Sequence, residues 1–326
     1  MGDPAGVGPE IVVKALSDPA LYKICRPMVL GDHGAIAAWL NKGDICSIRE
    51  ISHPLQASGT AGQIDLIPVC RLNSDCLVPG LPSTEGGAAM VECILAAVDM
   101  ALQQKIAAMV TCPISKVLMQ QAGYPYEGHT RLIAERTGTR DYVMMLAGEK
   151  LRVALVTIHC ALKDVPFLIQ REGILKTIAV TYKALAQDFA LKTPRIALAG
   201  LNPHAGEEGL FGKEEAEIIE PAVREAVRRG YSVQGPFPPD TIFHRAVSGN
   251  FDAVIAMYHD QGLIPLKLLH FSDAINVTLG LPIIRTSVDH GTAYDIAGKG
   301  AADPSSLKAA VRMAVMMARN RLNAEP

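Results

Sequence analysis

The chain of 326 residues has no apolar run that approaches the about 18 residues of a membrane span, and no signal-peptide pattern. Its seven cysteines are odd in number and widely spaced, and no CxxC pair occurs, which argues against a disulfide framework and a cysteine-type zinc site. The formal net charge is only −2, with Lys and Arg dispersed. We therefore expect a cytoplasmic protein whose partners include neither a membrane nor a nucleic acid.

What the chain does have is an alternation of short apolar runs with amphipathic stretches, which predicts an α/β fold with a parallel sheet. Strands are expected at residues 27–31, 64–69, 107–111, 142–147, 151–157, 195–199, 251–257 and 274–278. Helices are expected from about residues 9, 115 and 129, and at 34–40, 88–103, 166–188, 213–229 and 306–321. The segment 285–304 is rich in glycine and polar residues, and we expect it to lie outside the core.

Three histidines share one setting, because His159, His204 and His259 each follow an apolar strand. A single histidine after a strand is usually structural. In a parallel sheet, however, the carboxyl ends of the strands converge on one edge, which is where ligands bind. Three imidazoles suit Zn²⁺, Co²⁺ or Mn²⁺ better than Ca²⁺. The pattern therefore predicts a site for a divalent metal.

Cationic and amide side chains follow His259 within a short stretch of chain. Arg285, which follows the apolar run 281–284 and precedes Thr286 and Ser287, can bind a phosphate or carboxylate through two hydrogen bonds, whereas Lys267 offers a point charge. The alternative is a pair of surface cations, which is the commoner fate of a lysine. His129 and Thr130 stand at the start of a predicted helix, where an anion is favoured.

The N-terminal stretch GDPAGVGPE is a glycine-rich turn that leads into a helix. Such a turn normally follows a strand, so we expect either that the first strand of this domain is missing from the sequence or that the start has been misplaced. The glycines are equally compatible with an anion at the helix N-terminus and with a tight turn that binds no ligand.

Several motifs together resemble the 4-hydroxythreonine-4-phosphate dehydrogenase family, namely GDPAGVGPE, EGHT, NPHAGE, YHDQG, NVTLGLP and RTSVDHGTA. The resemblance runs from residue 2 to the final helix. FPPDT, GLFGKEE and HDQGLIPLKLL look closer to the branch that oxidises D-threonate or D-erythronate 4-phosphate. The family implies the two-domain α/β fold of isocitrate and isopropylmalate dehydrogenases, with the active site in the interdomain cleft. We expect one domain at 1–122 plus 293–326, and a second at 123–292 that carries the metal ligands and dimer contacts.

The resemblance also implies roles for individual residues. The metal ligands are His159, His204 and His259, and the substrate contacts are His129, Thr130, Lys267, Asn276 and Arg285. Lys267 is also a catalytic candidate, with Asp240 or Asp260 as weaker bases; Asp260 can instead orient a histidine or shape a turn, and we favour the orienting role. DHGTAYDIAGKGAADP looks like the adenosine-binding loop of isopropylmalate dehydrogenases, which assigns His290, Gly291, Thr292, Ala293 and Asp295 to the cofactor. No arginine is placed for a 2′-phosphate, which favours NAD over NADP.

The expected reaction is a metal-dependent, NAD-linked oxidation of the C3 hydroxyl of 4-hydroxy-L-threonine 4-phosphate or D-threonate or D-erythronate 4-phosphate. Decarboxylation would follow and give 3-amino-2-oxopropyl phosphate or dihydroxyacetone phosphate. One Zn, Co, Mn or Mg ion is expected in each site, and the family implies a homodimer whose active site is shared between subunits. The alternatives are an aromatic cis-dihydrodiol carboxylate dehydrogenase of the same fold and a non-catalytic protein that binds a phosphorylated ligand.

Overall fold

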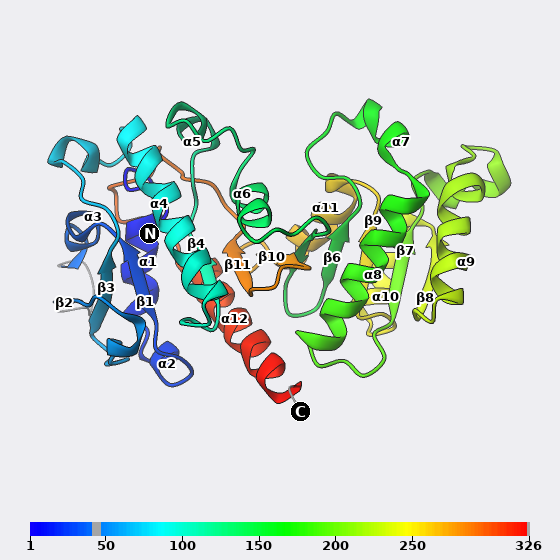
Figure 1. Cartoon of the computed structure of the whole chain (residues 1–326). Helices are drawn as coiled ribbons and strands as arrows, with labels where there is room; N and C mark the ends of the chain where they lie inside the picture. The colour runs from blue at the N-terminus through cyan, green and yellow to red at the C-terminus, as the bar shows by residue number, and fades with distance from the viewer. Residues whose placement is uncertain (41–46, 325–326) are drawn as a thin grey trace. The chain divides into compact units, whose positions relative to one another are not determined.

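A computed structural model describes residues 1–40 and 47–324 of the chain (Figure 1). The chain divides into two compact units: unit 1 is Met1–Arg140 with Leu281–Ala318, and unit 2 is Asp141–Gly280 with the chain from Arg319. These bounds differ from the predicted 1–122 plus 293–326 and 123–292. The reason is that α6 (His129–Arg136) and β11 (Arg285–Val288) pack in unit 1, on α4 and β4 respectively.

Unit 1 contains a parallel sheet in the order β1-β3-β2 and the parallel strand pair β4-β11. Its remaining strands are β1 (Met28–Gly31), β2 (Ser47–Glu50), β3 (Gln63–Pro68) and β4 (Met109–Thr111). Its helices are α1 (Gly8–Leu16), α2 (Pro19–Tyr22), α3 (His33–Ala37), η2 (Pro54–Gln56), η3 (Ser74–Leu77), α4 (Thr84–Leu102), α5 (Lys116–Gln121), α6 and most of α12 (Ser305–Ala324). The core gathers apolar faces of α1, α3 and β3, including Ile11, Ile36 and Leu66, all fully buried.

Unit 2 contains six strands in the order β10-β5-β6-β9-β7-β8. They are β5 (Val143–Ala147), β6 (Arg152–Leu155), β7 (Ile196–Ala199), β8 (Val233–Phe237), β9 (Ala253–Ala256) and β10 (Ile275–Leu279). The helices are η4 (Leu162–Asp164), α7 (Val165–Leu168), α8 (Arg171–Gln187), η5 (Pro203–Gly209), η6 (Glu215–Ile219), α9 (Glu220–Arg228), α10 (Pro239–Val247) and α11 (His259–Leu269). In the described part of the chain, no helix is both long and apolar enough to span a bilayer.

The expectation of a parallel sheet is wrong for β5. This strand runs antiparallel to both of its neighbours, β10 and β6. The turn between β5 and β6 is far too short for the crossover connection that parallel strands need, so a hairpin results. The other neighbours in unit 2, β6 with β9, β9 with β7 and β7 with β8, are parallel as predicted.

The expectation that segment 285–304 lies outside the core is also wrong at its start, because all four residues of β11 are buried. The polar side chains of this strand are compatible with burial because they find partners. The hydroxyl of Thr286 donates to Ala310 O at 2.9 Å, and that of Ser287 donates to Thr111 O at 3.3 Å. The polar composition of this segment therefore did not predict a buried strand, because the polar side chains form hydrogen bonds inside the protein.

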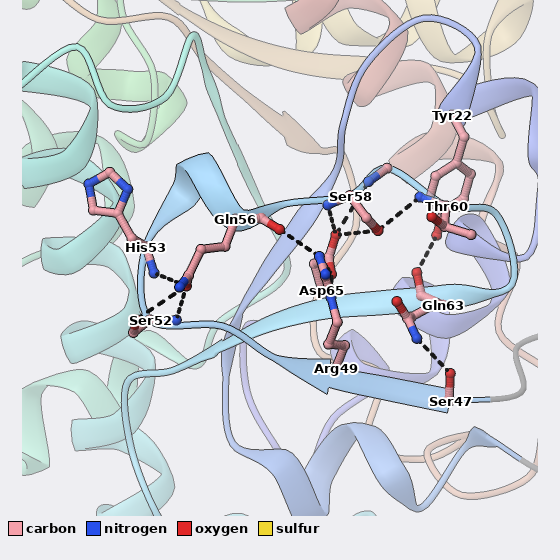
Figure 2. A network of polar contacts seen from close by, with 11 residues as sticks. Tyr22, Ser47, Arg49, Ser52, His53, Gln56, Ser58, Thr60, Gln63 and Asp65 are labelled. Carbon is pink, nitrogen blue, oxygen red and sulfur yellow. Dashed lines mark hydrogen bonds and ion pairs between the residues drawn. The ribbon is translucent and has the colours of Figure 1, made fainter.

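A network of polar contacts centred on Asp65 ties the loop that contains Gln56 and Ser58 to β2 and β3 of the small sheet in unit 1 (Figure 2). Asp65 lies in β3 and is 2% exposed. Its carboxylate accepts hydrogen bonds from Arg49 Nε at 2.7 Å and from the backbone N–H of Ser58 at 2.7 Å. Arg49 also donates to Gln56 O at 2.6 Å. Every group in this network has a partner within the loop or strand, so we interpret the network as structural.

Candidate metal and anion sites

The strand order of unit 2 places the three histidine segments side by side. β9 lies between β6 and β7 and is parallel to both, so the carboxyl ends of the three strands share one edge of the sheet. His159 follows β6, His204 follows β7 and His259 follows β9. The convergence of these strand ends, predicted from the sequence, is therefore present in the fold.

His159 and His259 are neighbours at this edge. Their ring centroids are 5.7 Å apart. Two imidazoles that bind one tetrahedral ion through bonds of about 2 Å place their ring centres about 5 Å apart, so the pair fits a shared metal. His159 is exposed and His259 is half-buried, which leaves this edge open to a substrate.

Asp260 holds the ring of His259. His259 is the first residue of α11, and its Nδ1 lies 2.7 Å from Asp260 Oδ1. A carboxylate that accepts from Nδ1–H fixes the tautomer and leaves Nε2 to bind a metal. This contact favours the orienting role for Asp260 over that of a base.

His204 lies in the loop after β7, and its ring faces Phe211 with a centroid separation of 6.2 Å. The backbone from His204 to Glu208 is left-handed at every residue, with φ between 44° and 86°. Each non-glycine residue in this conformation costs on the order of 1 kcal/mol, so its surroundings must hold the loop. As the described side chains stand, no group of three His, Cys, Asp or Glu is close enough to hold a metal.

Three residues that sequence reasoning missed tie the strand ends together. The side chain of Gln261 accepts from the backbone N–H of Met257 at 2.7 Å and donates to Gly200 O at 2.7 Å, which links the ends of β9 and β7. The hydroxyl of Thr157 donates to Met257 O at 2.7 Å and adds the end of β6. Gly262 lets α11 lie against this edge, because a Cβ there would be 2.4 Å from a methyl carbon of Val153.

The other predicted residues of unit 2 are placed as follows. Lys267 is half-buried in the last turn of α11, and Asp240 is exposed in the first turn of α10, a helix that packs on η5. Asn276 lies in β10, and its Oδ1 is inaccessible to solvent with no hydrogen-bond partner among the described residues. A buried acceptor of this kind is a ready contact for a ligand donor.

In unit 1, Arg285 forms the centre of a candidate anion site. It is the first residue of β11 and is 2% exposed. Its Nη2 donates to the hydroxyl of Thr111 at 2.9 Å, from the neighbouring strand β4. Burial lowers the pKa of Arg285 to about 10, which still leaves the guanidinium cationic at neutral pH. Thr111, a residue that no sequence pattern singled out, therefore orients this cation.

His129 lies beside Arg285 as the first residue of α6, followed by half-buried Thr130. Its Nε2 is inaccessible and has no hydrogen-bond partner among the described residues, so the ring bonds Cys112 O through Nδ1. Burial, together with the charge of Arg285, holds the pKa of His129 well below its ordinary value. The neutral ring therefore donates to Cys112 and offers a lone pair at Nε2, which accepts from a hydroxyl or amine rather than donating to an anion.

The depressed pKa of His129 predicts a pH dependence of stability. The unfolded chain protonates this residue near its ordinary pKa, while the folded chain does not until lower pH, so the stabilisation is present above about pH 6.5 and lost as the pH falls. Between pH 7.5 and 5.5, we expect the unfolding free energy of the wild type to fall by about 1 kcal/mol more than that of His129→Asn. Urea unfolding measures both. His244→Asn, at an exposed histidine, is the control. If the unfolding free energies of His129→Asn and His244→Asn depended equally on pH, the result would contradict the assignment.

The predicted cofactor residues lie in the loop after β11. His290, Gly291 and Asp295 are exposed, Thr292 and Ala293 are half-buried, and a Cβ at Gly291 would meet nothing within 4 Å, so the loop offers open backbone to a ligand. The N-terminal turn packs on this loop, since Val7 N donates to Thr292 O at 2.9 Å and a Cβ at Gly6 would lie 2.9 Å from that oxygen. These contacts favour a packing role for the glycines of GDPAGVGPE.

The fold and these residues define a mixed α/β protein with imidazoles at the carboxyl edge of parallel strands in one unit and a buried cation in the other. The family model described as Pyridoxal phosphate biosynthetic protein PdxA matches residues 23–314. The chain belongs to the PdxA family, which confirms the predicted resemblance.

Two relatives and one solved structure illustrate the match. A 4-hydroxythreonine-4-phosphate dehydrogenase of Desulforapulum autotrophicum is 52% identical over 99% of this chain and 96% of its own length. A D-threonate 4-phosphate dehydrogenase of Pectobacterium atrosepticum is 40% identical over 98% of each chain. The crystal structure of the 4-hydroxythreonine-4-phosphate dehydrogenase of Klebsiella pneumoniae is 42% identical over 98% of each chain, with a TM-score of 0.90. The predicted α/β fold class is confirmed.

Proposed function

We propose that this protein is a metal-dependent dehydrogenase that oxidises the C3 hydroxyl of a 4-phosphorylated four-carbon acid with NAD and then decarboxylates the product. The observation that supports the proposal is that β6, β7 and β9, which His159, His204 and His259 follow, are neighbours in the order β6-β9-β7 and parallel, so that their carboxyl ends share one edge. The substrate is 4-hydroxy-L-threonine 4-phosphate or D-threonate or D-erythronate 4-phosphate; the names of the relatives support the first two.

The three histidines would hold one divalent ion. Neutral imidazoles suit Zn²⁺ or Co²⁺. The carboxylate of Asp260 accepts a hydrogen bond from Nδ1 of His259 and so orients Nε2 toward the ion. When bound, the ion supplies Lewis-acid chemistry that makes the C3 hydroxyl easier to deprotonate. Three protein ligands would leave a fourth position on such an ion for that hydroxyl.

Two kinds of contact bind the substrate: a cation that pairs with an anionic group, and hydrogen-bond acceptors that bind its donor groups. Arg285 pairs with an anionic group of the substrate, and a buried guanidinium binds a phosphate or carboxylate strongly because little water competes. Neutral His129 accepts a hydrogen bond from a hydroxyl or amine of the substrate, and Asn276 Oδ1 accepts another. A hydrogen-bond acceptor that faces C2 of the substrate can bind either an amine or a hydroxyl at that carbon. The site therefore fits 4-hydroxy-L-threonine 4-phosphate as well as D-threonate or D-erythronate 4-phosphate.

The remaining chemistry follows from the substrate. The loop around residues 290–295 would hold NAD, which would supply the hydride acceptor for the oxidation at C3. The oxidised acid carries its carboxylate β to a ketone, so CO₂ leaves while the ketone oxygen takes up the electron pair. Lys267 stabilises that negative charge and returns a proton to C2, and Asp240 is a weaker candidate for this proton transfer.

The proposal includes a homodimer. Ile264 and Leu268, one turn apart on α11, are exposed at 68% and 85% and form an apolar stripe, and Phe271, two residues past the end of the helix, is 87% exposed. This helix begins at His259, so a partner subunit that covers the stripe would lie next to the metal ligands.

Leu268→Asp tests the dimer, because a charge in an apolar interface is costly to bury. We expect the variant to be monomeric by size-exclusion chromatography with light scattering and to lose dehydrogenase activity. Leu322→Asp, at a residue 66% exposed on α12, is the matched control. A wild-type monomer, or a dimeric Leu268→Asp variant, would contradict the proposed interface.

The test of the function is a side-by-side assay of the full chain, supplied with Zn²⁺ or Co²⁺, on the three phosphorylated acids. We expect NADH and CO₂ in equal amounts from at least one of them, and faster turnover with NAD⁺ than with NADP⁺. Oxidation of an aromatic cis-dihydrodiol carboxylate alone would select that alternative. Binding of the phosphorylated acids without turnover would select the non-catalytic alternative.

A further inference from the structure

The loop that carries His204 adopts a backbone that its own residues do not favour. From His204 to Glu208, five consecutive residues are left-handed, and four of them have a Cβ. L-residues visit this region as single residues and not as runs. A run of this kind persists where neighbouring groups hold it, and such places cluster at functional sites.

Glu215 is the group that holds the start of this loop. Its side chain is buried, with the residue 3% exposed. Oε1 accepts from the backbone N–H of Leu201 at 2.7 Å and of Asn202 at 2.8 Å, and Oε2 accepts from Asn202 Nδ2 at 3.0 Å. The same Oε2 lies 2.8 Å from where a Cβ on Gly206 would stand, so the carboxylate also packs against the turn.

The helix register around Glu215 explains how its carboxylate reaches the loop. Glu215–Ile219 forms a π-helical turn before α9. Pro221, near the start of α9, has no N–H to donate to the preceding turn, so the α-helical ladder cannot run through this point. A π-turn inserts one extra residue per turn, and such turns recur at functional sites. Here the turn directs Glu215 inward and Glu217 to solvent.

We propose that Glu215 is a positioning residue for His204, fixing the loop that presents this histidine to the metal. The proposal rests on the proposed function in taking His204 as a metal ligand. Three hydrogen bonds, two from the backbone N–H groups of Leu201 and Asn202 and one from the Asn202 side chain, converge on one carboxylate at the end of β7, which also packs against Gly206. Glu215 does not touch the metal or the substrate; it acts through the backbone at 201–206.

The substitution Glu215→Gln tests the proposal with little change in shape. The amide replaces one acceptor oxygen with an N–H donor that faces other N–H donors, and it removes the negative charge. We expect the metal-stripped variant to bind Zn²⁺ 10- to 100-fold more weakly by calorimetry, the range known for residues that support a metal ligand. Glu217→Gln, an exposed glutamate in the same turn, should bind as the wild type does.

A second substitution, at Gly206, disturbs the packing between the Glu215 carboxylate and the loop by changing the loop instead of the carboxylate. Gly206→Ala places a methyl 2.8 Å from Glu215 Oε2, at a residue with φ of 86°, and should weaken Zn²⁺ binding in the same direction. Unchanged Zn²⁺ affinity in well-folded Glu215→Gln would overturn the proposal.

Hydrogen exchange separates this proposal from the proposed function. In the metal-free protein, we expect the amides of Leu201 and Asn202 to exchange at least tenfold faster in Glu215→Gln than in Glu217→Gln. Equal exchange would overturn the anchoring role whatever the metal does. Faster exchange in a protein that binds no metal even as wild type would support the anchor and contradict the function assigned to it.

Discussion

Replacing Arg285 with methionine is expected to raise KM for the phosphorylated substrate about 100-fold. A charge-assisted, two-point contact to a phosphate or carboxylate is worth about 3 kcal/mol, and each 1.4 kcal/mol is a factor of ten. Burial favours this large value, because Arg285 is 2% exposed and already aimed by Thr111. Steady-state kinetics with NAD⁺ and metal at saturation measures the change.

Two controls make the Arg285 result specific. Arg312→Met removes a cation from the exposed side of α12, where it pairs with Asp18, and should leave KM unchanged. Thr111→Val keeps the cation but removes the hydroxyl that aims it, and should give a smaller rise in KM of about tenfold. An unchanged KM in a folded Arg285→Met variant would mean that the anion is held elsewhere.

Replacing His259 with alanine is expected to lower kcat/KM by about a thousandfold or more. Loss of one of three ligands weakens the metal, and Lewis-acid stabilisation of the transition state is worth about 4 kcal/mol, or a thousandfold in rate. Asp260→Asn, which keeps the ring but weakens its orientation, should cost less, about 10- to 100-fold.

The matched control for His259 is His244→Ala, an exposed histidine of α10 outside the candidate site. Its kinetic constants and metal content should equal those of the wild type. Full activity of His259→Ala after exhaustive chelation would contradict the role given to the three histidines.

The sequence was sufficient to predict the position of the three histidines relative to the sheet. Each follows an apolar run, and parallel strands bring their carboxyl ends to one edge, so strand periodicity alone predicts that the segments carrying His159, His204 and His259 meet at that edge. The pairing of β6, β9 and β7 confirms this for the strand ends, while the three side chains, as described, do not form a group close enough to hold a metal. Their role as metal ligands stays a prediction.

What the sequence did not predict depends on contacts between distant segments. Thr111 and Arg285 meet because β4 and β11 are paired although 174 positions separate them. The buried strand β11 was missed because its polar side chains are satisfied by partners that no local pattern reveals. Glu215 was hidden within an ordinary charged helix, and Pro221 was the one local signal that this helix could not be regular.

His129 shows how the structure refines a residue that the sequence had already selected. A histidine at a helix start indicated an anion contact. Burial beside Arg285 keeps the ring neutral, and Nδ1 is committed to Cys112 O, so only an acceptor faces the ligand. The positive charge at this site therefore belongs to Arg285, and His129 is expected to recognise a hydroxyl or amine.

The most direct test of the central claim is the metal stoichiometry and ligand set of the wild-type protein. Metal-stripped protein should bind one Zn²⁺ or Co²⁺ per chain, recover NADH formation in proportion, and show a first coordination shell of three imidazole nitrogens by X-ray absorption. Full NADH formation without metal, or a bound ion whose first shell contains no histidine nitrogen, would contradict the account.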